Sequence, residues 1–458
     1  MLLQSGASAY SFTALPGVLM DINDGGIMNL SGEEQNFIAL TDGNGQVGVF
    51  TITQFGGISG DGVVFTEYGA KIPGINGGAV FFTTGDTSAG TASFHNLGGT
   101  VSGAGGGILV IESFSDAGES TIINEGGEVR GAEGGQTIFQ VSDPSAADAT
   151  IIANGGSVSG AGGGLISFFN SSQGADSTLI ANGGSSGGGG GEIFFRDTSD
   201  GGKARVEVFG NGALDVTLSS ERSIAVGSIE GDGLVVLAAN ELSVGANGLS
   251  TTFSGLISDA NGPGGSIAKT GRGTLTLTGA NAYSGGTTVQ RGSLVVTNTS
   301  GSATGTGAIS VTAGTLGGSG IIAGAVTVGT GSGAGAFLAP AHGGKKQLIL
   351  TIQGSVTFNS DATYTYTFKA KGNKSKIDKV IANGVTINSG AQVNLSGTTQ
   401  GQLIQGTALT LIKNTAATPI SGTFSNLPEG GIVNVNGNNL QASYSGGDGN
   451  DLTLTVVP

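Results

Sequence analysis

The clearest pattern along the chain is a set of short apolar–polar alternations that recurs at a nearly constant interval between positions 77 and 212. Paired glycines end at Gly99, Gly127, Gly156 and Gly184, so each pair follows the one before it by roughly 28 positions. A second set follows nearly the same period: Gly78, Gly107, Gly135, Gly164 and Gly191. Runs of period two predict half-buried strands, and a fixed repeat of this length predicts stacked coils.

Apolar residues also recur at fixed places within each repeat. Two places after the second glycine set are Val80, Leu109, Thr137, Ile166 and Ile193, and four places after it are Phe82, Ile111, Phe139, Phe168 and Phe195. Because residues two apart on a strand share a face, both columns predict internal stacks. The unit 149–176 predicts strands at Thr150–Ala153, Ser157–Ser159 and Leu165–Asn170. A chain coiled throughout in this way would make roughly 16–20 coils.

The stretch 271–296 predicts strand, turn, strand, turn, strand. Leu275 and Leu277 alternate with threonines, and the apolar pattern restarts at Val289 and again at Leu294. Gly and Asn in the two intervening segments are turn signals, since both tolerate positive φ. Three short strands without a helix between them predict one coil of a parallel β-helix.

This stretch closely resembles the autotransporter-associated β-strand repeat, also called the passenger-associated transport repeat. The matching positions are Lys269, Gly271, Gly273, Thr274, Leu275, Leu277, Gly279, Asn281, Tyr283, Gly285, Gly286, Thr287, Val289, Gly292 and Leu294. The resemblance implies a secreted or surface-displayed bacterial β-solenoid, the passenger-like part of an autotransporter, and it implies no catalysis.

The fold class expected is therefore all-β: a right-handed parallel β-helix with a C-terminal β-rich capping module. We expect degenerate N-terminal coils or a cap at 1–76, and a β-helix of regular repeats at 77–215. The segment 216–329 continues the β-helix and contains the autotransporter-associated repeat at 269–296. The segment 330–458 holds the last coils and the cap, because 421–430 and 444–457 resemble the closing module of this family.

Composition agrees with stacked strands and narrows the partners. Glycine makes up 91 of 458 residues, about three times its usual share of roughly 7%. The net charge of −15 argues against nucleic acid, which binds through lysine and arginine. The chain has no cysteine, so no disulfide holds it together. No apolar run is as long as a transmembrane helix requires.

The segment 1–26 lacks the basic start and sustained apolar core of a signal peptide. No run of alternating barrel strands follows the last strand at the other end. We therefore expect a fragment, or a protein exported by another route, with an extracellular or cell-surface location.

Candidate catalytic groups are sparse, and the sequence predicts no enzyme, catalytic residue or cofactor. The two histidines, His95 and His342, lie in no recognisable Ser-His-Asp arrangement. Lyases and hydrolases built on β-helices need clustered carboxylates. Asp197 and Asp200, near Arg196 and Lys203, come closest to such a cluster.

Two polar motifs allow a binding and a structural interpretation. Asn96, Asn124, Asn154 and Asn182 recur at one turn, which predicts an internal amide ladder, with a ligand-binding row as the alternative. The string 446–454 fits the calcium-binding nonapeptide and makes Asp448 and Asp451 weak metal candidates. Such sites use stacked copies, and this chain holds one, so no metal site is predicted.

The most unusual local feature is a lysine cluster in an otherwise acidic chain: Lys369, Lys371, Lys374, Lys376 and Lys379, with Lys345 and Lys346 upstream. It predicts either a patch for anionic polysaccharide or lipid head groups, or a solvated loop. Tyr364, Tyr366 and Phe368 share one strand face, which predicts a core stripe beneath the cap, with a sugar platform as the alternative.

These observations predict a non-enzymatic extracellular β-solenoid, a stalk or adhesin-like structural protein of a Gram-negative bacterium. A carbohydrate-active β-helix enzyme is the alternative, and a self-assembling surface fibre is a variant. The partners expected are a cell-surface polysaccharide or a ligand on a host or neighbouring surface, with no nucleic acid.

Overall fold

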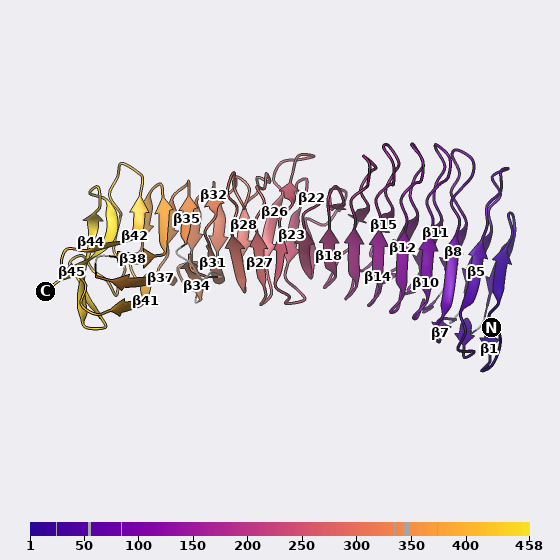
Figure 1. Cartoon of the computed structure of the whole chain (residues 1–458), viewed down its shortest axis with the longest axis horizontal. Coiled ribbons are helices and arrows are strands. Elements are labelled where there is room, and N and C mark those ends of the chain that lie inside the picture. Colours follow the sequence, from indigo (N-terminus) through magenta and orange to yellow (C-terminus); the bar gives the residue numbers. More distant parts are fainter. Residues whose placement is uncertain (24, 54–55, 84, 334, 343–347, 373) are drawn as a thin grey trace. The chain divides into compact units, whose positions relative to one another are not determined.

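The computed structural model describes all residues of the chain except 24, 54–55, 84, 334, 343–347 and 373. The described chain is all-β and winds as a parallel β-solenoid of about 14 turns that ends in a mixed sheet, which confirms the predicted fold class (Figure 1). The predicted right-handed winding stays a prediction. The chain forms two compact units, Met1–Leu242 (unit 1) and Ser243–Pro458 (unit 2), and the division falls within the predicted segment 216–329.

Unit 1 is built from two long parallel sheets. Successive long strands along the chain alternate between the two sheets, so each coil adds one strand to each. One sheet contains β2 (Ser11–Ala14), β5 (Gln35–Ala39), β8 (Val63–Glu67), β10 (Ser93–Asn96), β12 (Thr121–Asn124), β14 (Thr150–Ala153), β16 (Thr178–Ala181), β18 (Arg205–Val208) and β21 (Ser228–Gly231). The other contains β3 (Leu19–Ile22), β6 (Val49–Ile52), β9 (Ala79–Phe82), β11 (Ile108–Glu112), β13 (Gln136–Gln140), β15 (Leu165–Phe168), β17 (Glu192–Phe195), β19 (Ala213–Asp215) and β22 (Leu234–Val236). Short strands complete the unit: β1 (Leu2–Leu3), β4 (Ile27–Asn29), β7 (Ile58–Ser59), β20 (Ser223–Val226) and β23 (Glu241–Val244), which crosses the unit boundary.

The two predicted columns form part of the core of unit 1, and the other sheet contributes a stack that was not predicted. Phe139, Phe168 and Phe195 lie directly opposite one another in the register of β13, β15 and β17, and all three are fully buried. Their ring centroids are 4.6 and 4.7 Å apart, close to the spacing of about 4.8 Å between neighbouring strands. A second stack, Phe12, Phe37, Phe65 and Phe94, has centroid distances of 4.9, 4.8 and 5.0 Å. Each of these rings therefore packs on the equivalent ring of a neighbouring coil.

The second glycine set closes the base, or neck, of each projecting loop. In each loop the second-set glycine donates its N–H to a carbonyl at the start of the same loop, as Gly164 does to Asn154 at 2.7 Å. The same bond closes the loops at Gly78, Gly107, Gly135 and Gly191. A Cβ at Gly164 would lie 2.2 Å from the Asn124 carbonyl oxygen of the preceding coil. These glycines are needed for close backbone approach, and the loops rise as a row above the indigo and purple strands (Figure 1).

Replacing Gly164 with alanine is expected to destabilise unit 1 by about 1–3 kcal/mol, because the added methyl group forces two packed backbones apart. The matched control is Gly43→Ala, at a loop glycine around which a Cβ meets nothing within 4 Å. Urea unfolding followed by circular dichroism measures both variants. Equal midpoints for the two would contradict the close-approach explanation.

The loops also explain one wrong prediction. Ser157–Ser159 forms a turn rather than a strand, because it lies between the neck glycines, and Gly160 follows it with φ of 77°. Each coil of this region therefore carries two strands, Thr150–Ala153 and Leu165–Phe168 in the unit 149–176. The count of about 14 turns is below the expected roughly 16–20, since the last strands leave the parallel winding.

Unit 2 has three parallel sheets. The first contains β24 (Thr251–Phe253), β27 (Thr274–Leu277), β29 (Ser293–Val296), β31 (Gly314–Gly318), β34 (Ala336–Ala339), β37 (Ala362–Lys371) and β41 (Gln392–Gln400), with β38 (Lys374–Ile377) paired antiparallel to β37. The second contains β26 (Ser266–Lys269), β28 (Thr287–Val289), β30 (Ile309–Val311), β33 (Val326–Val328), β36 (Val356–Phe358) and β40 (Val385–Ile387). The third contains β32 (Ile321–Ile322), β35 (Ile349–Ile352), β39 (Lys379–Ala382) and β42 (Ala408–Asn414), and β25 (Leu256–Ser258) precedes these strands in the chain.

The parallel winding stops at β42. From there the third sheet continues through antiparallel strands, in the order β45 (Asp451–Val457), β44 (Asn438–Gly446) and β43 (Ile432–Val435). This meander is the predicted C-terminal β-rich module, and it pairs the free edge of β42. Within the described residues, no helix is long and apolar enough to cross a bilayer.

Candidate functional site

The lysine cluster forms a three-stranded surface at the end of β37. Along this strand Tyr364, Tyr366 and Phe368 point inward, while Lys369 and Lys371 are exposed. Gly372, with φ of 58°, follows the strand and allows the chain to reverse into β38. The antiparallel register then sets Lys369 opposite Lys376 and Lys371 opposite Lys374, so four lysines occupy one face.

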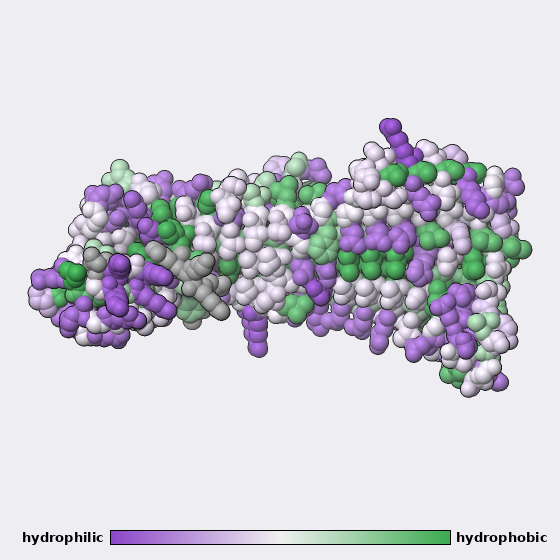
Figure 2. Space-filling model, viewed as in Figure 1, coloured by the Kyte–Doolittle hydropathy of each residue, from purple (hydrophilic) through white to green (hydrophobic). Residues whose placement is uncertain are grey.

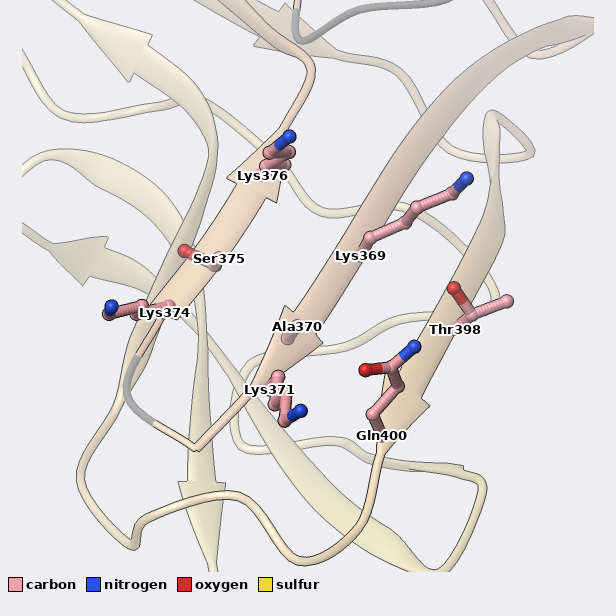
Figure 3. Close-up of a pocket in the computed structure, with 8 residues that line it drawn as sticks. All are labelled: Lys369, Ala370, Lys371, Lys374, Ser375, Lys376, Thr398 and Gln400. Carbon is pink, nitrogen blue, oxygen red and sulfur yellow. The ribbon is translucent and has the colours of Figure 1, made fainter.

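The third strand of this surface is β41, on the other side of β37. Its parallel register places Thr398 beside Lys369 and Gln400 beside Lys371. Together with Ala370 and Ser375 these residues and the four lysines line an open groove of about 830 Å³ (Figure 3). We call these eight residues the lysine groove. Sequence reasoning missed Thr398 and Gln400, because nothing in the local pattern shows which strand lies beside β37.

The remaining lysines of the cluster lie outside the groove. Lys379 begins β39, where it lies opposite Ile349 in the third sheet and is half-buried. Lys345 and Lys346 lie outside the described residues. Four of the five candidate lysines are therefore brought together, and the fifth is not.

The groove carries uncompensated positive charge. The ion pairs found among the described residues join Lys203 to Asp176 and Arg205 to Glu207 and Glu230, all in unit 1. No described carboxylate lies within ion-pairing distance of Lys369, Lys371, Lys374 or Lys376. This occurs in a chain with 32 acidic and 17 basic residues.

The aromatic stripe beside the lysines is part of the core, as the favoured interpretation predicts. Tyr364, Tyr366 and Phe368 are each no more than 1% exposed, and the Tyr364 hydroxyl donates to the Leu411 carbonyl at 2.7 Å. Burial raises the pKa of both tyrosine hydroxyls. The stripe supports the groove from below and presents no ring to a ligand.

The calcium-like string forms an antiparallel hairpin turn between β44 and β45, which differs from the stacked parallel coils such sites require. Asp451 is buried and accepts the Asn414 backbone N–H at 2.9 Å, and burial raises the pKa of its carboxyl group. Asp448 is exposed in the turn. Among the described residues, no group of three or more histidine or acidic side chains is placed to hold a metal ion.

The predicted asparagine ladder is two separate pairs. Asn96 and Asn124 are buried at the ends of β10 and β12, and Asn96 Nδ2 donates to Asn124 Oδ1 at 2.7 Å. In the next coils Ala153 occupies this inner position. Asn154, one residue later, therefore lies on the outside, where Asn182 Nδ2 donates to its Oδ1 at 2.9 Å. The prediction of one continuous ladder was wrong. Asn154 lies one residue past the inner position, and a shift of one residue moves a side chain to the other face of a strand.

The outer face beside these asparagines is apolar. Ile123, Ile152 and Ile180 lie in register and are half-buried on the outward side of β12, β14 and β16. Figure 2 shows a short green row over this part of unit 1, next to a purple row. The row covers only three coils.

The two candidate catalytic carboxylates, Asp197 and Asp200, accept hydrogen bonds from backbone N–H groups. Asp197 accepts the Asn170 N–H at 3.1 Å, and Asp200 accepts the N–H groups of Ala225 at 2.6 Å and Gly202 at 3.3 Å. Lys203 pairs with Asp176, while the Arg196 guanidinium lies over the rings of Phe169 and Phe194. His95 is on the outer face of β10 in unit 1, and His342 is exposed in unit 2.

The stretch 271–296 forms its three predicted strands, but they do not belong to one coil. β27 lies directly against β29, with Leu275 opposite Leu294, so the first and third strands lie in successive coils, and that part of the prediction was wrong. The polar residues of 267–296 are structural. The Tyr283 hydroxyl is buried 2.7 Å from Thr287 Oγ1, and Asn281 Oδ1 accepts the Ile257 N–H at 2.8 Å. Lys269 is 1% exposed, and its ammonium group donates to the carbonyls of Thr270, Gly271 and Arg291. No acidic side chain faces Lys269 in the described ion pairs, and burial lowers its pKa to about 8.

This lysine predicts a pH dependence of unit 2. The folded chain releases the Lys269 proton near pH 8, whereas the unfolded chain holds it to 10.5, so stability is expected to rise with pH from about 8 towards 10. Above that the buried tyrosines oppose the trend, because their raised pKa values favour unfolding once free tyrosine ionises.

The measurement is the urea midpoint of the full chain at pH 7.5, 8.5 and 9.5. Lys269→Met removes the titrating group and should flatten the rise. A rise of equal size in the variant would exclude Lys269 as its source.

Comparison with known sequences gives a match within the solenoid of unit 2. No curated protein matches the chain. Residues 267–296, which include the stretch predicted to form one coil, match the family model described as Passenger-associated-transport-repeat.

Proposed function

We propose that this chain is a non-enzymatic, exported β-solenoid of the autotransporter passenger type, which serves as a stalk or adhesin-like part at the cell surface or in the medium. The observation that carries the proposal is the matched repeat, 267–296, whose strands stack in register within the solenoid. β27 pairs with β29 and β29 with β31, while β26 pairs with β28 and β28 with β30. The repeat thus contributes strands to two successive coils in unit 2, and the same two sheets continue beyond it.

The non-enzymatic part of the proposal is supported by how the polar residues are used. Within the repeat, buried Lys269 and Asn281 bond to backbone groups, and the buried Tyr283 hydroxyl bonds to the Thr287 hydroxyl. Asp197 and Asp200 accept backbone N–H groups in their turns. Each coil offers its edge to the next, which makes stepwise stacking a suitable route to a long, protease-resistant support.

The test is the location of the protein in its source cells. Intact cells are labelled with a membrane-impermeant biotin reagent and then fractionated, with a cytoplasmic enzyme as the control for lysis. Recovery of labelled chain at the surface, or of chain in the medium, supports the proposal. Recovery only with the cytoplasmic control would contradict export and with it the passenger role.

A further inference from the structure

The lysine groove contains charge that the fold does not need. Lys369 faces Lys376, and Lys371 faces Lys374, and like charges directly opposite on neighbouring strands are destabilising. A carboxylate at either position would have relieved this repulsion. The chain is rich in acidic residues, yet no described one pairs with the four lysines.

Protection of a sheet edge explains only half of the arrangement. Lysines on an edge strand keep other chains from pairing with it, and β38 is such an edge, since β37 is its one partner strand among the described residues. Lys369 and Lys371 are on β37, which has β38 on one side and β41 on the other. A central strand needs no such protection, so these two lysines require another explanation.

The spacing of the lysines suits an extended anion with repeated charges. Residues two apart on one strand are about 7 Å apart, and directly opposite residues are about 5 Å apart. The four lysine side chains therefore leave the backbone at the corners of a small rectangle, and their ammonium groups diverge (Figure 3). Lysine is a flexible point charge, unlike the planar arginine fork that fits one phosphate closely. Four flexible lysines at this spacing can therefore each pair with a separate carboxylate or sulfate group along an extended chain.

The remaining lining narrows the class of ligand. Thr398 and Gln400 offer a hydroxyl and an amide group on the same face as the lysines, and these suit sugar hydroxyls. No aromatic residue lines the groove, although single-stranded nucleic acid binds on aromatic side chains. The groove also lacks large apolar side chains that would enter a lipid surface.

We propose that the lysine groove binds an acidic polysaccharide, with Lys369, Lys371, Lys374 and Lys376 pairing with its carboxylate or sulfate groups and with Thr398 and Gln400 contacting its hydroxyls. The site requires only the folded unit 2, so it does not depend on where the protein is located.

The experiment measures binding of the purified full chain to polygalacturonate by isothermal titration calorimetry at 50 mM NaCl, with neutral dextran as the uncharged comparison. The test variant is Lys369→Gln/Lys371→Gln/Lys374→Gln/Lys376→Gln. The matched control, Lys71→Gln/Arg130→Gln/Arg222→Gln/Arg272→Gln, removes the same charge from positions elsewhere. The test variant should keep or raise its melting temperature, since it removes two like-charged pairs.

We expect binding to polygalacturonate and not to dextran, a loss on the order of tenfold or more in the test variant, and little change in the control. Raising NaCl to 500 mM should weaken binding of the natural chain and barely affect the test variant. Equal affinity in the two variants would overturn the proposal. Binding to phosphatidylglycerol vesicles without binding to polygalacturonate would also overturn it, in favour of a membrane surface.

Discussion

Replacing Phe168 with alanine is expected to lower the free energy of unfolding by about 3–5 kcal/mol, as truncation of a buried phenylalanine generally does. Phe168 is fully buried between Phe139 and Phe195, with ring centroids 4.6 and 4.7 Å away. Its removal takes one ring from the middle of a stack and leaves both neighbours with a cavity on one side. Because coils in a solenoid contact only adjacent coils, the loss falls on two coil interfaces at once.

Urea unfolding of the full chain, followed by circular dichroism, measures this loss. Phe114→Ala is the control, since Phe114 is 58% exposed in a loop of the same unit. The control should lose well under about 1 kcal/mol, the usual range for surface changes. A similar loss in both variants would show that the stack contributes no more than an exposed ring.

Replacing Glu67 with glutamine is expected to stabilise unit 1 at neutral pH and to remove a pH dependence of the natural chain. Glu67 is fully buried at the end of β8, and neither of its carboxyl oxygens has a hydrogen-bond partner among the described residues. The register places it next to Asn96, whose Oδ1 also lacks a partner among those residues. Burial raises the pKa of this carboxyl group well above 4.5.

The direction of the pH dependence follows from that shift. The folded chain keeps the Glu67 proton to a higher pH than the unfolded chain, so stability is fully present below about pH 4.5 and decreases as pH rises. The slope is at most about 1.4 kcal/mol per pH unit for one group. Glutamine keeps the shape, carries no charge and offers an N–H to the Asn96 amide oxygen.

Urea midpoints at pH 4.5, 6 and 7.5 check this prediction. Glu67→Gln should be nearly flat where the natural chain decreases, and Glu119→Gln, at a carboxylate outside the core, should follow the natural chain. If the natural chain were as stable at pH 7.5 as at pH 4.5, a costly buried carboxyl at Glu67 would be excluded.

The stack that contains Phe168 could be predicted because two periods of the sequence determine its position. Period two within a strand assigned Phe168 to an inner face, and the longer period between coils aligned it with Phe139 and Phe195. The repeat at 267–296 was predictable for a similar reason, since its glycines and apolar residues hold fixed spacings. Where two independent periods agree, few alternative arrangements remain.

Predictions failed where one residue or one long-range pairing decided the outcome. Asn154 was aligned with Asn124, but the register pairs Asn124 with Ala153, so Asn154 lies one residue past the inner position and its side chain is on the outer face. Ser157–Ser159 has strand-like residues, but the neck at Gly164 forces the chain into a projecting turn. Local propensity cannot report where the preceding coil's backbone lies.

The lysine groove shows the same limit. Alternation placed Lys369 and Lys371 on one face, and Gly372 signalled a reversal, so the facing of Lys374 and Lys376 could have been inferred from the sequence. The contribution of β41 could not, because Thr398 lies far along the chain from its partner Lys369, and no local signal fixes that register.

The necked loops of unit 1 have a further consequence. Their tips are also linked to one another, since Gly103 N–H donates to the Gly131 carbonyl at 2.6 Å and Gly131 N–H to the Gly160 carbonyl at 2.7 Å. Successive tips are therefore held at the strand spacing, roughly 4.8 Å. A side chain that recurs at one tip position therefore forms a straight row. The distance between its copies is similar to the length of one unit of an extended polymer and much smaller than the diameter of a globular protein. The loop architecture therefore fixes the distance between groups at equivalent tip positions, and a substitution at a tip changes the displayed group without changing that distance.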